Sequence, residues 1–355
     1  MRGHLGAREL GAVALLLILG RLAWIEPTML VDNPGPSAYL VPLLAFPLGM
    51  LALWFAVRAV RTTGDPIACF TRLFGRKGGV AATLVLVVWM AGLSTLAVSR
   101  VAVVTRYYFF PQTEAGVILA LYMVAILASA CAGAFGVGRT ARLIVGVPVA
   151  ALALLYLMNV PQMDPSRLSP FWGEGVGALA ESSVLNAAMY WSALLIWLWR
   201  PYTNGQSTTV RGLWRGLAIG GALTALTLWC VVQSMGSSTY ADAASLLYAI
   251  ASNIDLGRFL QRLGPLFFFC WSMASILGNA AILFTAGDLC RRAARSGDAR
   301  PYTAAIAAGM IGLGTLFAHG QAAGVAQMMG LFACTGMVLF PLLGWLASLR
   351  KEKRT

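Results

Sequence analysis

Charged residues are scarce in this sequence of 355 amino acids. Asp, Glu, Lys and Arg together make up only 11% of the chain, whereas 59% of the residues are hydrophobic and the mean hydropathy is +0.76. A soluble domain contains about 25% charged residues, so the composition excludes an ordinary soluble protein. It indicates a polytopic membrane protein.

Histidine is nearly absent, and cysteine follows no recognisable pattern. His4 and His319 sit near a terminus and in an expected loop, which excludes a metal site or a hydrolytic triad built on histidine. The six cysteines are scattered singly, mostly in apolar stretches and without a Cys-x-x-Cys pair, so we interpret them as packing residues. We therefore expect no enzyme, no metal and no other cofactor.

Long apolar runs are what the sequence has in abundance. Ten of them approach or exceed the roughly 20 residues that a helix needs to cross a bilayer. We predict an all-α protein with about ten transmembrane helices, at Leu10–Met29, Tyr39–Val57, Val80–Phe109, Ala115–Ala134, Ala141–Met158, Val184–Leu198, Leu213–Val232, Leu260–Leu289, Tyr302–Phe317 and Ala326–Leu349.

Basic residues alternate between the connections of these ten runs. With the N-terminus placed in the cytoplasm, the inner segments hold 20 of the 26 Lys and Arg residues. This bias predicts that both termini are cytoplasmic. It also explains the net charge of +13 without a nucleic-acid partner, while contact with the anionic headgroups of the lipid bilayer is expected.

The longest outer connection divides the ten predicted helices into two groups of five. We predict a single transmembrane domain over residues 1–355, with a first five-helix repeat at 1–158, an outer loop at 159–183 and a second repeat at 184–355. Because five is odd, the second half must run through the membrane in the opposite sense, which is an inverted repeat. In such proteins the first helix of each half is typically broken and binds the substrate.

The first helices of the two halves carry the candidate binding residues. Gly20 and Arg21 interrupt the first run, and a charge within a membrane helix usually faces a cavity. In the sixth run Ser192 stands beside Tyr190 and Trp191; spacing alone favours ordinary aromatic packing there, and only the position in the repeat suggests a site.

Four stretches of the sequence resemble parts of one known family. They are "RLSPFWGEGVGALAES" at 167–182, "LLYAIASNIDLGRFLQRLGPLFFFCW" at 246–271, "FTRLFGRKGG" at 70–79 and "SRVAVVTRYYFFPQTE" at 99–114. In that order they resemble the segment before the sixth helix, the entry to the eighth helix, the loop before the third helix and the end of the third helix of the spore-germination permeases, which are the B subunits of nutrient germinant receptors. The four stretches follow the order of the family along most of the chain.

This resemblance implies the fold of the amino acid–polyamine–organocation superfamily, with five plus five helices. It also implies a subunit in the inner membrane of a dormant spore that senses a small nutrient, commonly an amino acid, together with an A-type subunit and a lipoprotein C-type subunit. The implied pocket lies between the first, third, sixth and eighth helices. Its residues in this chain are Gly20, Arg21, Leu22, Ala23, Ser94, Thr95, Tyr190, Trp191, Ser192, Trp271 and Ser272.

Two positions depart from the pattern of the family. Gly20-Arg21-Leu22 stands where members often have Gly-small-Gly, and Leu194 stands where a carboxylate is common in the sixth helix. Arg21 therefore has three interpretations: it contacts a carboxylate of the ligand, it pairs with an outer carboxylate such as Glu26, or it snorkels to the interface. Between Gly173 and Gly175, Glu174 is predicted to cap a turn of the outer loop.

Three functions fit the sequence. The first is a germinant receptor subunit that signals when its nutrient binds. The second is a free-standing secondary transporter of an amino acid with a cation, for which the sequence offers few ionisable residues in the expected pathway. The third is a scaffold subunit that binds no ligand.

Overall fold

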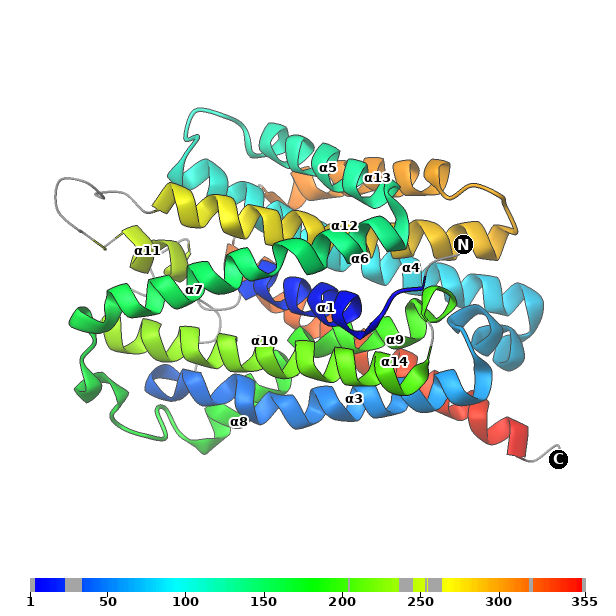
Figure 1. Cartoon of the computed structure of the whole chain (residues 1–355), viewed down its shortest axis with the longest axis horizontal. Coiled ribbons are helices and arrows are strands. Elements are labelled where there is room, and N and C mark those ends of the chain that lie inside the picture. Colours follow the sequence, from blue (N-terminus) through cyan, green and yellow to red (C-terminus); the bar gives the residue numbers. More distant parts are fainter. Residues whose placement is uncertain are drawn as a thin grey trace.

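The computed structural model describes residues 4–22, 34–203, 205–235, 245–252, 254, 264–318 and 322–352. These residues form helices joined by short connections, with a single isolated bridge between Leu5 and Thr203. Most of the helices run roughly parallel to the long axis of a bundle, and α1 begins and α14 ends at the same end of it (Figure 1).

The first half of the bundle contains six α-helices. They are α1 (Ala7–Leu22), α3 (Val41–Thr63), α4 (Pro66–Tyr108), α5 (Ala115–Cys131), α6 (Gly133–Ile144) and α7 (Gly146–Asn159). A short 3-10 helix, η1 (Gly35–Leu40), precedes α3. Helix α6 begins at Gly133, eight residues before the predicted span at Ala141, so the stretch predicted as a connection is helical.

The connection and the second half follow. They consist of η2 (Val160–Gln162), η3 (Pro165–Leu168), α8 (Val176–Asn186), η4 (Ala187–Leu194), α9 (Leu195–Leu198), η5 (Arg200–Tyr202), α10 (Gln206–Ser234), α11 (Leu246–Ser252), α12 (Gly264–Ala294), α13 (Arg300–Ala318) and α14 (Ala322–Glu352). Helix α8 begins within the predicted outer loop.

Among the described residues, six helical segments are long and apolar enough to cross a membrane. They are Gly35–Arg61, Pro66–Tyr108, Gly133–Gln162, Gln206–Ser234, Gly264–Ala294 and Arg300–Ala318, and shorter apolar helices cover Ala115–Cys131 and Leu331–Ala347. The protein is therefore an all-helical, multi-pass membrane protein. The count of ten crossings and the five-plus-five repeat stay predictions.

Helix α1 lies at the centre of the bundle. From Leu10 to Leu22 every residue except Gly11 and Arg21 is buried, as expected for a helix that is apolar on all sides. It packs closely on α10, where a Cβ built on Gly11 would lie 2.7 Å from the carbonyl oxygen of Gly212. Helices α5, α7 and α13 lie at the periphery and expose apolar side chains, among them Leu121, Leu157 and Leu316.

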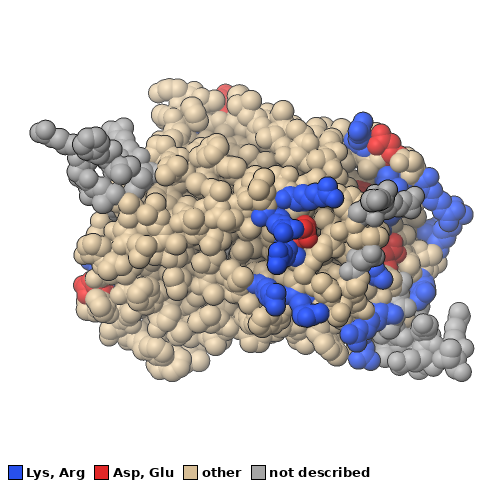
Figure 2. Space-filling view, in the orientation of Figure 1, with Lys and Arg blue, Asp and Glu red and all other residues tan. Residues whose placement is uncertain are grey.

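Basic side chains gather toward the end of the bundle where α1 begins and α14 ends (Figure 2). We call this end the basic end. Its exposed arginines and lysine come from the helix ends that meet there, and include Arg58, Arg61, Arg72, Arg76, Lys77, Arg139, Arg142, Arg200, Arg211, Arg215, Arg295 and Arg300. Two segments are tied together at this end by the Leu5 amide, which donates to the carbonyl oxygen of Tyr202 at 2.9 Å.

Candidate functional site

A small cavity lies where α1, α4, η4 and α12 meet. Its volume is about 20 Å³, which is space for about one water molecule. Its polar lining comes from Arg21, Ser275 and Asn279, and Trp191 forms an aromatic wall. The other lining residues are small or aliphatic: Leu16, Leu17, Gly20, Leu93, Ala97, Gly278 and Ile282.

Gly20 brings α1 close to α12 at this cavity. A Cβ built on Gly20 would lie 3.0 Å from the Cα atom of Ser275 and 3.3 Å from the carbonyl oxygen of Ala274. These neighbours are backbone atoms, so any larger side chain would push the two helices apart. The helix continues through Gly20 and Arg21 to Leu22, the last described residue of this segment. Close packing is thus the observed role of Gly20, and an interruption of the first span stays a prediction.

Arg21 lies in the last turn of α1 and lines the cavity. Its Nη1 atom donates to the carbonyl oxygen of Ala188 in η4 at 3.3 Å. A cation in the last turn of a helix also interacts favourably with the negative end of the helix dipole. Arg21 thus joins α1 to the first residues of η4. Ala23 and Glu26 lie outside the described residues.

The sixth predicted span is interrupted by η4, a 3-10 helix of eight residues that are all buried. Runs of this type longer than three or four residues are uncommon and often mark a functional hinge. Within η4, Trp191 lines the cavity and packs edge-on against Trp89, with ring centroids 5.7 Å apart. This change of helix type lies in the sixth predicted span, although η4 contains neither glycine nor proline.

Three polar side chains meet at the α4–α12 side of the cavity. The Ser94 hydroxyl donates to the Asn279 Oδ1 atom at 2.7 Å, and the Asn279 Nδ2 atom donates to the carbonyl oxygen of Ser275 at 2.8 Å. Asn279 and Ser275 were not predicted from the sequence. Their four-residue spacing puts both on one face of α12, and this polar pair within an apolar span was the available signal.

A family model described as spore germination protein matches residues 12–289 of this chain. The chain belongs to the spore germination protein family. The match covers most of both predicted halves, and it includes every residue that lines the cavity. A comparison with curated proteins found no significant match.

The structure divides the residues implied by this family resemblance into two groups. Gly20, Arg21 and Trp191 line the cavity, and Ser94 reaches it through Asn279. Leu22, which is fully buried, does not line it.

The second group points elsewhere. The Tyr190 hydroxyl donates to the carbonyl oxygen of Pro42 at 2.8 Å, and the Thr95 hydroxyl donates to the Ala91 carbonyl oxygen of its own helix. The Ser192 hydroxyl is buried and has no hydrogen-bond partner among the described residues. None of the three is among the lining residues.

In α12, Trp271 and Ser272 also lie away from the cavity lining. Trp271 stacks on Phe267 with ring centroids 6.4 Å apart. Ser272 shares a hydrogen bond of 2.7 Å with the Tyr122 hydroxyl of α5.

The Gly173–Glu174–Gly175 segment lies beside η1. Gly173 has a φ of 55° and contacts Pro34, and the Glu174 side chain lies against Gly35. Helix α8 begins after Gly175 without a side-chain cap. Contacts with η1 are thus the observed role of this segment.

Proposed function

We propose that this protein is the membrane B subunit of a spore nutrient germinant receptor. In this proposal a small nutrient with a carboxylate group binds in the cavity between α1, α4, η4 and α12, and binding signals germination to A-type and C-type subunits in the spore inner membrane. The observation that carries the proposal is the position of Arg21 at the junction of α1 and η4, inside the cavity.

The chemistry of the lining supports a carboxylate. The described lining residues include one guanidinium group and no carboxylate. A guanidinium group can bind a carboxylate through two parallel hydrogen bonds, and the amide of Asn279 and hydroxyl of Ser275 offer further polar contacts. The remaining walls are apolar, as is usual in small-molecule sites.

Ligand binding requires the cavity to expand, because about 20 Å³ holds no more than about a water molecule. The segment that would move is η4, since it carries Trp191 in the cavity wall and accepts the Arg21 hydrogen bond. A nutrient that replaces the Ala188 carbonyl oxygen as the partner of Arg21 would release η4. Differential affinity for the closed and expanded forms then provides the signal.

The test is the thermal stability of the purified protein in detergent, measured with amino acids, sugars and small carboxylates. We expect a saturable increase in Tm with one class of carboxylate, because a ligand that binds only the folded state stabilises it. Arg21→Ala should abolish the increase. The matched control is Arg106→Ala, which removes an exposed arginine in the last turn of α4, away from the cavity lining. This variant should retain the increase in Tm.

A scaffold subunit that binds no nutrient is the second candidate, and the small volume of the cavity favours it. A cooperative melt with no increase in Tm for any compound would support the scaffold and contradict the receptor proposal. A free-standing transporter would instead accumulate the stabilising compound in liposomes that contain this chain alone.

A further inference from the structure

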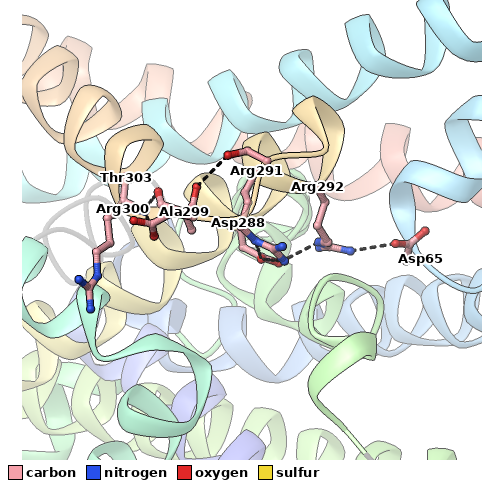
Figure 3. Close-up of polar contacts among 9 residues, drawn as sticks. Asp65, Asp288, Arg291, Arg292, Ala299, Arg300 and Thr303 are labelled. Carbon is pink, nitrogen blue, oxygen red and sulfur yellow. Dashed lines mark hydrogen bonds and ion pairs between the residues drawn. The ribbon is translucent and has the colours of Figure 1, made fainter.

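Four charged side chains form a network at the basic end, where α12 ends and α4 begins (Figure 3). Asp288 has only 3% of its side chain exposed and contacts two arginines: Arg291 Nη2 lies 2.7 Å from Oδ1, and Arg292 Nε lies 2.8 Å from Oδ2. Arg292 also reaches α4, because its Nη1 atom lies 2.8 Å from Asp65 Oδ2. Arg292 thus bridges two carboxylates on different helices.

Asp65 is also the N-cap of α4. Its Oδ1 atom accepts a hydrogen bond from the Ala68 amide at 2.8 Å, while Oδ2 faces Arg292. At Gly75 the helix is kinked, with φ 72° and ψ −179°, and a Cβ there would meet nothing within 4 Å. Residues 66–74 therefore form a separate short helix, which we call the basal helix.

The basal helix packs against the core through buried side chains. Phe70 is fully buried, and its ring centroid lies 5.7 Å from that of Trp197 in α9 and 6.3 Å from that of Phe340 in α14. Beside it the Cys69 thiol, also fully buried, donates to the carbonyl oxygen of Leu343. The basal helix thus covers the basic end of the segment that continues from η4.

Helix α12 connects this network to the cavity. Ile282 lines the cavity and Asp288 follows six residues later, which corresponds to about 9 Å along a helix. Between them the Trp199 indole donates to the Thr285 hydroxyl at 2.6 Å. Along α12, Trp199 therefore lies between the cavity and the charged network.

We infer that the Asp65–Arg292 ion pair is a latch that holds the basal helix closed over the basic end of the cavity. The latch can open reversibly because Asp288 keeps Arg291 and Arg292 as partners when Asp65 leaves, so no buried charge is left uncompensated. The released Asp65 still caps α4, and Gly75 supplies a hinge that no packed side chain blocks. The latch controls access from the basic side, whether or not the cavity binds a nutrient.

Cys69 is a native probe of the latch, because it lies on the basal helix and is buried when the helix is closed. The experiment uses the full-length protein in detergent with Cys69 as its single cysteine, and measures the rate of modification by a small maleimide. Asp65→Asn breaks the ion pair and keeps the cap, since Asn and Asp are equally good N-caps. Arg292→Gln breaks the pair from the other side.

We expect each latch variant to raise the rate of Cys69 modification about tenfold. Tenfold corresponds to about 1.4 kcal/mol, which lies between the values for exposed and buried ion pairs. The double variant should react no faster than the faster single variant, because either substitution alone already removes the Asp65–Arg292 pair. Asp298→Asn and Arg76→Gln remove exposed charges at the same end and should leave the rate unchanged.

A second single-cysteine protein distinguishes opening from general unfolding. Cys230 is buried in α10, with 1% of its surface exposed, and its modification should stay slow in every latch variant. The inference is overturned if the latch variants modify Cys69 at the wild-type rate. It is also overturned if Cys230 accelerates in parallel with Cys69, because the ion pair would then hold the whole fold.

Discussion

Gly20→Ala is expected to destabilise the protein even though alanine is the better helix former. The new Cβ would lie 3.0 Å from Ser275 Cα and 3.2 Å from its backbone nitrogen, where ordinary contact begins at 3.4 Å. Because backbone atoms cannot rotate away, α1 and α12 must separate by several tenths of an ångström. Overpacking of this kind costs about 1–3 kcal/mol, against a gain in helix propensity of about 1 kcal/mol.

Gly309→Ala is the matched control for this substitution. Gly309 also lies within a helix, α13, but a Cβ there would meet nothing within 4 Å. Gly309→Ala should therefore show only the gain in helix propensity. The free energies of unfolding of the two variants should differ by about 1–3 kcal/mol, which is the overpacking cost. Thermal melts in detergent measure the difference, with Gly20→Ala lower in Tm than wild type and Gly309→Ala equal or higher. Equal Tm values for the two variants would refute the close packing of α1 on α12.

Two further predictions concern hydrogen bonding and pH. Ser94→Ala should lower the free energy of unfolding by about 1–3 kcal/mol, because it leaves the buried Asn279 Oδ1 atom without its donor. The control is Thr95→Val, which removes only a hydrogen bond within one helix and should lower the Tm less in a thermal melt. Burial, followed by the nearby charge of Asp288, raises the pKa of Tyr202 to about 12. Since the folded protein favours the neutral phenol, this contribution to stability is complete below pH about 10 and is lost as the pH rises toward about 12. The ionisation of Tyr202 is measured as the difference in tyrosinate absorbance between wild type and Tyr202→Phe during a pH titration. A Tyr202 that ionises near pH 10 would contradict the burial effect.

Hydrophobic runs were sufficient to predict an all-helical, multi-pass membrane protein, because burial in lipid or in the bundle demands the same apolar side chains. The predicted ends of the helices were less accurate where a helix begins with polar residues. Helix α10 begins at Gln206, seven residues before the predicted Leu213, since its first two turns are polar and lie at the basic end. Helix α8 begins at Val176, within the stretch predicted as the outer loop.

The candidate site was predicted in part. Gly20 and Arg21 were found because a glycine and a cation stand out in an apolar run, and Trp191 because of its place in the sixth span. Hydropathy does not determine the rotation of a helix about its axis, so Thr95 and Tyr190 were expected at the cavity although they face other helices.

The 3-10 helix η4 also makes the sixth span adjustable in length. A 3-10 helix rises about 2.0 Å per residue and an α-helix about 1.5 Å, so the eight residues of η4 would shorten by about 4 Å if they became α-helical. Such a conversion would draw α8 and α9 toward each other and rotate Trp191 relative to Arg21. The length of the sixth span therefore depends on the hydrogen-bonding pattern of its backbone.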